Sequence, residues 1–219
     1  MRRTSGRAAA WLVQPAYLLV ELGVAAVALT ASAAYSLRDD TISSLGQLTC
    51  APGHGGSEVM VCSPGHLVLD AAFILFGLLR VVGAISLVHR LAPGLARTIA
   101  TMCWVASGVA SAAVGLAPVD ALPTVHSLVA APVFVLQPLA VLASAVALRR
   151  SPATAPRWVA TLGLAVGALT VVGAIAFGLR IGSPTWVGGL ERLALWPTYP
   201  WLGVVGWWAL TSERRSARQ

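Results

Sequence analysis

The sequence has 219 residues, of which 57% are hydrophobic and only 11% are charged. Soluble domains carry about 25% charged residues, so this composition excludes an ordinary soluble domain, and its apolar content excludes a disordered chain. The mean hydropathy is +0.79, and the apolar residues form long blocks, which is typical of a protein that spans a bilayer. The net charge is +7 and every basic residue is an arginine, but the arginines lie in short clusters between apolar blocks. This spacing argues against a nucleic-acid-binding face.

Six apolar blocks predict an all-α fold, a single domain over residues 1–219 built as a bundle of six transmembrane helices. Each block has about the 17–25 residues that a helix needs to cross the hydrocarbon core. The expected spans cover residues 11–36, 65–88, 95–117, 124–148, 157–180 and 193–211.

The arginines between the blocks predict the orientation of the bundle. Eleven of them lie at the two termini and in the second and fourth gaps: Arg2, Arg3, Arg7, Arg90, Arg97, Arg149, Arg150, Arg157, Arg214, Arg215 and Arg218. The positive-inside rule places these segments, and therefore both termini, in the cytoplasm. The arginine- and alanine-rich composition favours a bacterial plasma membrane. A cleaved signal peptide within residues 1–36 is the alternative to an uncleaved first helix, but Pro15 and Glu21 interrupt its long apolar run.

The longest predicted external loop, residues 37–64, contains Cys50 and Cys62. Two cysteines on one loop in an oxidising compartment favour a disulfide. Two free thiols are the alternative. A metal held by this pair would need further ligands. The third cysteine, Cys103, lies within an apolar block and is expected to be a small buried residue.

Two charged residues lie deep in the predicted spans, Glu21 in the first and Arg80 in the second. Each is ten residues from the cytoplasmic end of its block, which corresponds to a depth of about 15 Å. Adjacent antiparallel helices would bring them together, so the sequence predicts a buried ion pair between Glu21 and Arg80. The pair would either fix helix register or line a transport pathway.

A second polar group collects near the predicted external face. His66 and Asp70 share one helical face, because they are four residues apart at the start of the second span. Further histidine, acidic and basic residues lie at the ends of other spans, with several serines close by in sequence: Asp40, Asp120, His126, Glu191, Arg192, Ser36, Ser43, Ser44 and Ser63. The alternative to a site is a set of helix caps and interfacial anchors.

Three chemistries could use this polar group. His66, Asp70 and His126 are the candidate ligands of a divalent metal, and no other cofactor is indicated. The same three residues are the candidate catalytic groups, in which histidine and aspartate would activate water or a serine. The group could instead hold a lipid headgroup by hydrogen bonds. The sequence has no His-Glu-x-x-His, Cys-x-x-Cys or Gly-x-Ser-x-Gly motif that would decide between them.

Several short motifs resemble those of the bacterial membrane family catalogued as domain of unknown function 998. They are the stretches 35–46, 62–77, 115–126 and 188–193, which together extend over nearly the whole chain. The resemblance implies a six-helix integral membrane protein and brings no established reaction. The chain departs from the expected motif at Asp70, where an asparagine is expected.

The leading functional hypothesis is therefore binding or handling of a lipid or other amphipathic molecule near the outer leaflet. Its ligand-binding residues would be Asp40, His66, Asp70, Asp120, His126, Glu191 and Arg192. A membrane-embedded hydrolase or transferase is the first alternative, followed by a small transporter and a structural partner subunit. The expected partners are the bilayer and an amphipathic ligand rather than nucleic acid.

Overall fold

The computed structural model describes residues 9–32, 35–53, 59–151 and 156–216, and most of them are helical. Five helices in this part of the chain are long and apolar enough to cross a membrane: Ala9–Thr30, His66–Arg90, Leu95–Leu116, Pro123–Arg149 and Arg157–Arg180. These five helices identify an integral membrane protein. They are one fewer than the six spans that the sequence predicts.

The elements follow one another as α2 (Ala16–Ser32), the 3₁₀ helix η1 (Ile42–Gly46), β1 (Ala51–Pro52), β2 (Met60–Val61), α3 (His66–Leu87), the 3₁₀ helix η2 (Val88–Arg90), α4 (Leu95–Leu116), α5 (Pro123–Arg149), α6 (Arg157–Arg180), α7 (Val187–Leu195) and α8 (Thr198–Ser216). The two short strands pair in antiparallel orientation. The four central spans begin and end within two residues of the limits predicted from the sequence.

The first helix is shorter than predicted. α2 ends at Ser32, and Tyr35 already belongs to the following loop. In this loop the Asp40 carboxylate accepts a hydrogen bond from the Ser36 N–H at 2.8 Å. A side-chain acceptor here replaces the backbone carbonyl that a continuing helix would supply, so the polar residues before η1 end the helical run.

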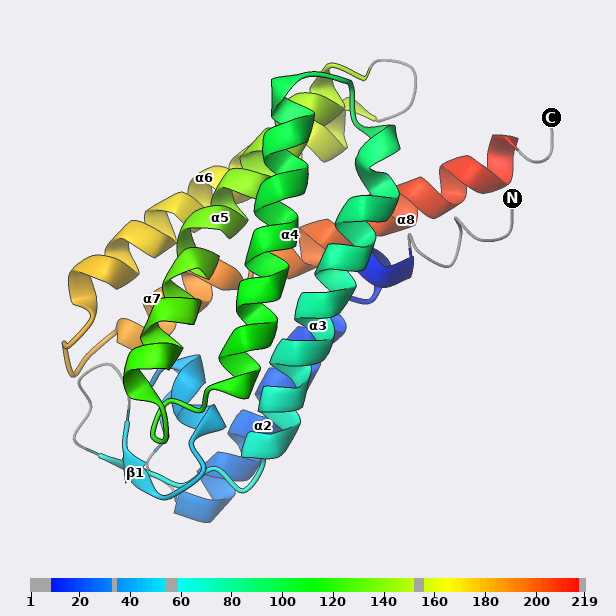
Figure 1. Cartoon of the computed structure of the whole chain (residues 1–219). Helices are drawn as coiled ribbons and strands as arrows, with labels where there is room; N and C mark the ends of the chain where they lie inside the picture. Colours follow the sequence, from blue (N-terminus) through cyan, green and yellow to red (C-terminus); the bar gives the residue numbers. More distant parts are fainter. Residues whose placement is uncertain (1–8, 33–34, 54–58, 152–155, 217–219) are drawn as a thin grey trace.

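The predicted sixth span, residues 193–211, consists of parts of two helices. α7 ends at Leu195 and α8 begins at Thr198. Pro197 lies between them, and proline disfavours an uninterrupted helix because it lacks an N–H and its ring clashes with the preceding turn. The last residues of α8 read Ser-Glu-Arg-Arg-Ser, which is too polar for a membrane core. Figure 1 shows α8 running obliquely behind α4 and α3 and projecting beyond the bundle.

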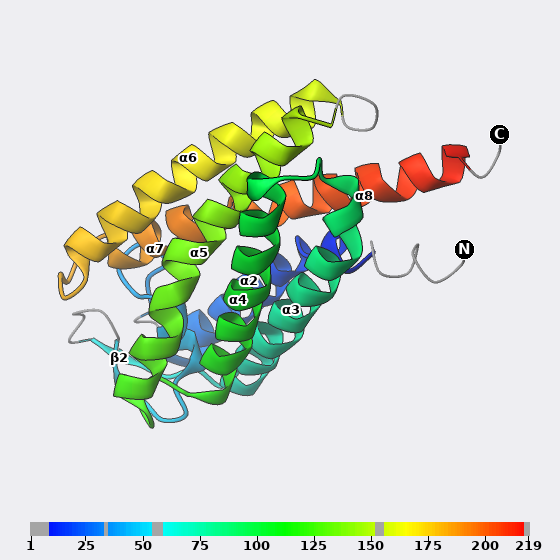
Figure 2. The ribbon, with the colours of Figure 1, turned by 45° about the horizontal axis from the view of Figure 1, so that its top comes forward.

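Helices that are neighbours along the chain pack side by side (Figures 1 and 2): α2 on α3, α3 on α4, α4 on α5, α5 on α6 and α6 on α7. One close approach is between Gly77 of α3 and Gly108 of α4. A Cβ atom on Gly77 would lie 2.5 Å from the Gly108 carbonyl oxygen. Glycine thus lets the two backbones touch, as small residues do in membrane helix pairs.

Aromatic rings hold α8 in the core despite its oblique course. The ring centroid of Trp104 in α4 is 5.4 Å from that of Trp11, which precedes α2, and 6.5 Å from that of Trp201 in α8. Tyr199 of α8 stacks on Tyr17 of α2 at 4.5 Å. All five rings are buried. α8 is therefore part of the packed interior rather than an appended tail.

Three connections lie at one end of the bundle, which we call the polar end. They are the connection from α2 to α3 (described over residues 35–53 and 59–65), the connection from α4 to α5 (residues 117–122) and the connection from α6 to α7 (residues 181–186). The polar end is the lower left of the molecule in Figure 1. The predicted disulfide is confirmed, because Cys50 and Cys62 are bonded, with their Cα atoms 4.3 Å apart. Cys103 is free and partly buried in α4.

Candidate functional site: a cavity between α5 and α6

A cavity of about 300 Å³ lies between α5 and α6 at the polar end. Its polar lining comes from five residues in three parts of the fold: Thr41 and Ser43 at η1, His126 and Ser127 of α5, and Glu191 of α7. The remaining wall is almost entirely apolar and includes Ala130, Ala131, Phe134, Ala174, Phe177 and Ile181. The cavity therefore has one polar region and one long apolar side.

Ser43 and His126 are hydrogen-bonded to each other inside this cavity. The distance from Ser43 Oγ to His126 Nε2 is 2.9 Å, and His126 Nδ1 lies 2.7 Å from the backbone carbonyl oxygen of Ala117. A carbonyl oxygen can only accept, so Nδ1 carries the proton in the neutral ring and donates it to Ala117. Nε2 is then the acceptor of the Ser43 hydroxyl proton. Both side chains are more than nine-tenths buried, with exposed fractions of 9% and 4%.

Glu191 is the acidic group of the cavity. One of its carboxylate oxygens accepts a hydrogen bond from the Ile42 N–H at 2.6 Å, which ties α7 to η1. Burial raises the pKa of the Glu191 carboxyl to about 7, while the Arg192 charge and the Ile42 N–H act in the opposite direction. Glu191 also lines a smaller cavity of about 30 Å³ that extends inward to Tyr199.

Arg192 is not part of the cavity lining and instead binds the loop before η1. Its Nη1 donates to three backbone carbonyl oxygens, at 2.7 Å to Leu37, 3.0 Å to Asp40 and 3.1 Å to Gly188. Its Nη2 donates to the Tyr35 hydroxyl. The donors of this guanidinium are directed to protein groups, so Arg192 positions residues 35–42 rather than facing the cavity.

The charged partner of Glu21 is Arg192 and not Arg80, which corrects the ion pair predicted from the sequence. Arg192 Nε lies 3.1 Å from Glu21 Oε1, and both side chains are buried. The Trp196 indole N–H donates to the other Glu21 oxygen at 3.0 Å.

Helix register explains the difference. The Trp11 indole N–H donates to the Arg80 carbonyl oxygen, so Arg80 lies level with Trp11. Glu21 is ten residues further along the first helix, which is about 15 Å. The Arg80 guanidinium instead lies over the Tyr199 ring of α8, 5.6 Å from its centroid, and its Nη2 is 3.4 Å from the Tyr199 hydroxyl.

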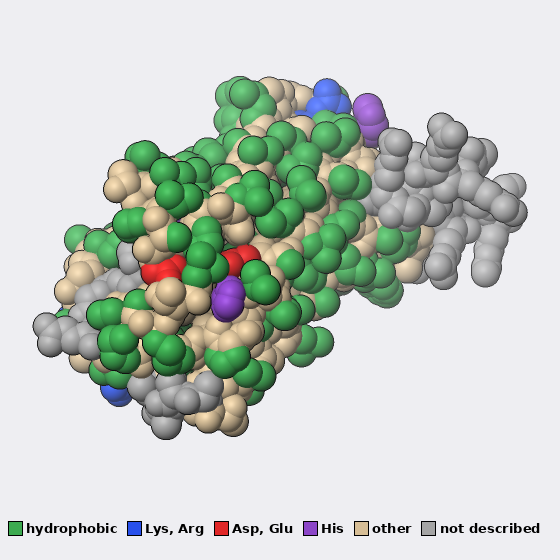
Figure 3. Space-filling model, turned by 60° about the horizontal axis from the view of Figure 1, so that its bottom comes forward, with side chains coloured by type: hydrophobic (Ala, Val, Ile, Leu, Met, Phe, Trp, Pro, Cys, Tyr) green, Lys and Arg blue, Asp and Glu red, His purple; other side chains and the backbone are tan. Residues whose placement is uncertain are grey.

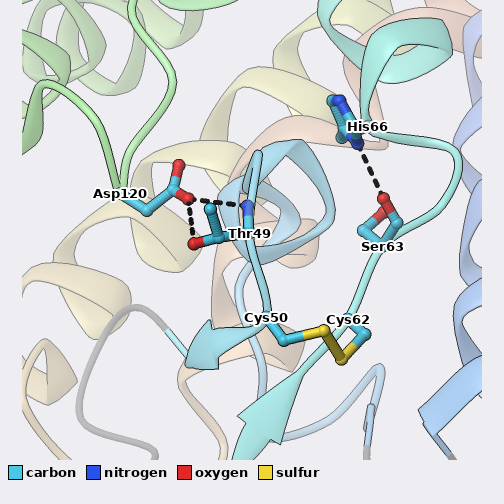
Figure 4. Close-up of a disulfide and its surroundings, with 6 residues drawn as sticks. All are labelled: Thr49, Cys50, Cys62, Ser63, His66 and Asp120. Carbon is cyan, nitrogen blue, oxygen red and sulfur yellow. Dashed lines mark hydrogen bonds between the residues drawn. A yellow bond between two sulfur atoms is a disulfide. The ribbon is translucent and has the colours of Figure 1, made fainter.

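The remaining predicted site residues are arranged around the disulfide loop (Figure 4). The Asp120 carboxylate accepts hydrogen bonds from the Leu48 and Thr49 N–H groups and the Thr49 hydroxyl, at 2.9–3.1 Å. Burial raises the pKa of Asp120, but these bonds outweigh it, and the pKa is lowered overall. His66 Nδ1 lies 2.9 Å from the Ser63 carbonyl oxygen. Asp120 and His66 therefore both hold the disulfide loop in place.

Asp70 packs against the end of η1, because a Cβ atom on Gly46 would lie 2.7 Å from its Oδ1 atom. Acidic and histidine side chains lie close together on this face of the molecule (Figure 3). Within the described ranges, no three His, Cys, Asp or Glu side chains are placed to hold a metal ion. Both ring nitrogens of His126, one of the three candidate ligands, already face protein groups, Ser43 and Ala117.

The structure thus divides the predicted site residues into three groups. His126 and Glu191 line the cavity, and Asp40 and Arg192 shape the loop that leads to η1. His66 and Asp120 anchor the disulfide loop, and Asp70 packs against the end of η1. Sequence reasoning missed the role of Ser43. The only signal was its place in a hydroxyl-rich stretch near the polar group, and that signal did not distinguish it from Ser44.

Comparison with known proteins identifies a family but no characterised relative. No curated protein and no solved structure matches the chain significantly. A family model described as protein of unknown function (DUF998) matches residues 7–208. Since this match covers almost the whole chain and agrees with the resemblance in the sequence motifs, the chain belongs to the DUF998 family.

Proposed function

We propose that the protein binds an amphipathic molecule of the membrane in the cavity between α5 and α6. The polar group of the ligand would lie against Ser43, His126 and Glu191, and its apolar chain would follow the α5–α6 groove. The observation that supports this proposal is the division of the cavity into a polar region and an apolar wall.

A second cavity extends the apolar side. It also measures about 300 Å³ and shares Phe134 and Ala174 with the first. The rest of its lining is apolar, from Val135, Pro138, Leu139, Val171 and Ile175. Together the two cavities have the size of a small-molecule site. Val135 and Ile175 are each 60% exposed on the outer surface of the bundle, so a chain could enter sideways from the bilayer.

The orientation predicted from the arginines completes the proposal. It places the polar end at the outer leaflet of a bacterial plasma membrane, because most arginines belong to the opposite segments. In this arrangement residues 193–211, which are the end of α7 and most of α8, would make the sixth crossing and bring both termini to the cytoplasmic side. The buried aromatic residues of α8, Tyr199 and Trp201, support its place inside the bundle.

Native mass spectrometry of the full chain, purified in mild detergent with added phosphatidylglycerol, tests the binding. Ala174→Phe should reduce lipid retention at least tenfold, because Ala174 lines both cavities. Leu179→Phe is the matched control, since Leu179 lies on the same helix, is 81% exposed and lines neither cavity. Equal lipid retention in the wild type and both variants would contradict the proposal.

A further inference from the structure

We propose that Ser43 and His126 are a nucleophile and base that transfer the acyl group of an ester bound in the α5–α6 cavity. This inference rests on the proposed binding function and assigns a reaction to the same site. The ligand class is then an acyl ester with an apolar chain.

The first support is the geometry of the pair. Activated serine nucleophiles require a base within about 2.6–3.2 Å and a third group that orients the base. Ser43 Oγ and His126 Nε2 are 2.9 Å apart, and the Ala117 carbonyl oxygen holds Nδ1 at 2.7 Å. The carbonyl performs the orienting part of the role that a carboxylate has in a Ser-His-Asp triad, because it fixes the tautomer and the plane of the ring.

The second support is the position of the pair in the cavity. Ser43 lines both the 300 Å³ cavity and the smaller inner one, and His126 lines the larger. The serine therefore lies at the inner limit of the space in which an acyl chain would be held. A low-dielectric wall of alanine and phenylalanine side chains strengthens the charge interactions that develop during proton transfer.

Glu191 lines the same cavity and offers a third polar group. Burial raises the pKa of its carboxyl to about 7, which favours the protonated form more than in a free glutamate. A protonated carboxyl can donate a hydrogen bond to an ester carbonyl oxygen as negative charge builds up on it.

The chemical steps balance without an external redox agent. Ser43 Oγ forms a bond to the ester carbonyl carbon while its proton moves to His126 Nε2. The carbon–oxygen bond to the alcohol breaks, and the alcohol leaves with the proton from Nε2, so that an acyl-Ser43 ester remains. Water or the hydroxyl of a second molecule then attacks the acyl carbon and gives its proton to Nε2. That proton returns to Ser43 as the new acid or ester leaves.

The alternative is a structural hydrogen bond that only fastens η1 to α5. Such a bond would leave Ser43 with the ordinary, low reactivity of a hydroxyl group. Serine reactivity therefore separates the two roles, and the test is made on the wild-type chain, which does not depend on the folding of a variant.

The experiment exposes the full chain in mild detergent to a long-chain alkyl fluorophosphonate and maps the adduct by mass spectrometry. We expect one phosphonyl adduct on Ser43 and none in Ser43→Ala. His126→Gln should slow labelling at least 100-fold, the scale of a lost general base. Ser86→Ala is the control, because the Ser86 hydroxyl donates to the Val82 carbonyl oxygen on α3 and Ser86 does not line this cavity. That variant should be labelled at the wild-type rate.

No adduct on Ser43 of the wild type, or equal labelling of His126→Gln, would overturn the assignment of a nucleophile and base. Phosphatidylglycerol retention is measured on the same samples by native mass spectrometry. If the wild type retains lipid and is not labelled, the binding proposal stands and acyl transfer fails. If Ser43 is labelled and no lipid is retained at the cavity, binding of a membrane lipid fails while the reactive pair remains.

Discussion

The Glu21 carboxylate of α2 accepts a hydrogen bond from Arg192 Nε of α7 at 3.1 Å, across 171 positions of sequence. The same guanidinium holds the carbonyl oxygens of Leu37 and Asp40, immediately before η1. This one pair therefore links the first span to the short helix that carries Ser43. A buried charge pair with no place in the cavity still determines where the cavity residues lie.

A double-mutant cycle on this pair should show strong coupling. Removing one partner of a buried ion pair costs about 3–5 kcal/mol, because the other charge is left without its counter-charge. Glu21→Gln and Arg192→Met should therefore couple by at least about 1 kcal/mol in the free energy of unfolding, measured by denaturant titration in mixed micelles. Glu21→Gln combined with Arg80→Leu is the control and should couple by less than half of that value. Equal coupling in both cycles would contradict the pairing seen in the structure.

The stability of the protein should decrease between about pH 4.5 and pH 7 because of Glu191. Burial raises the pKa of its carboxyl to about 7 in the folded protein, from an ordinary value of 4.5. The folded state therefore binds the proton more tightly, and the unfolded state loses it first as the pH rises. Arg192 and Glu21 act on it electrostatically, Tyr199 lines the smaller cavity with it, and His126 lines the larger one.

Glu191→Gln should flatten this dependence by up to about 3 kcal/mol, since each pKa unit corresponds to about 1.4 kcal/mol. The measurement is the unfolding free energy of both proteins from pH 4.5 to 8. Parallel curves for the two proteins would show that Glu191 ionises normally. The amide oxygen of glutamine can still accept the Ile42 N–H, so the variant keeps that contact.

The disulfide should be visible in thiol counts and in stability. Without reductant, a denatured sample should take up one alkylating group, at Cys103, and after reduction it should take up three. Replacing Cys50 and Cys62 by alanine should lower stability by about 3 kcal/mol if the bond acts by restricting the unfolded loop. Cys103→Ala is the control and should change stability far less. Alkylation of all three cysteines before reduction would exclude the bond in the purified protein.

The contact between α3 and α4 should not tolerate a side chain at Gly77. A Cβ atom there would meet the Gly108 carbonyl oxygen at 2.5 Å and the Ala112 nitrogen at 2.8 Å, so the helices must separate. We expect Gly77→Ala to lower the melting temperature, at a cost of about 1–3 kcal/mol for an overpacked contact. Gly23→Ala is the matched control in α2, because its Cβ would have no atom within 4 Å. A variant at Gly77 as stable as the one at Gly23 would contradict the close contact.

The limits of the helices could be predicted where composition alone decides them. The span from 157 to 180 agrees with α6, since an arginine bounds a long apolar run at each end. The last span could not be predicted in the same way. The average composition of that segment does not reveal the break at Pro197 between α7 and α8 or the polar last turn of α8.

The candidate site was predicted only in part. The sequence indicated His126 and Glu191 by their chemistry and their place at span ends. It paired Glu21 with Arg80 because equal depth was the only available guide. The register of the first helix against α3 places Arg80 beside Trp11 instead. The depth of a residue along its own span gives no information on the register between two helices or on the direction of a side chain.

The sequence by itself determined that this is a helical membrane protein, and it favoured a disulfide in the longest predicted loop. Apolar length and charge placement suffice for the helical membrane fold, because the thickness of the bilayer and the cost of burying charge act on each segment separately. Only the tertiary structure decided that Ser43 meets His126 and that Glu21 meets Arg192. Those contacts depend on the rotation and register of several helices at once. They are set by close packing between segments, as at Gly77 and Gly108, and no single segment encodes them.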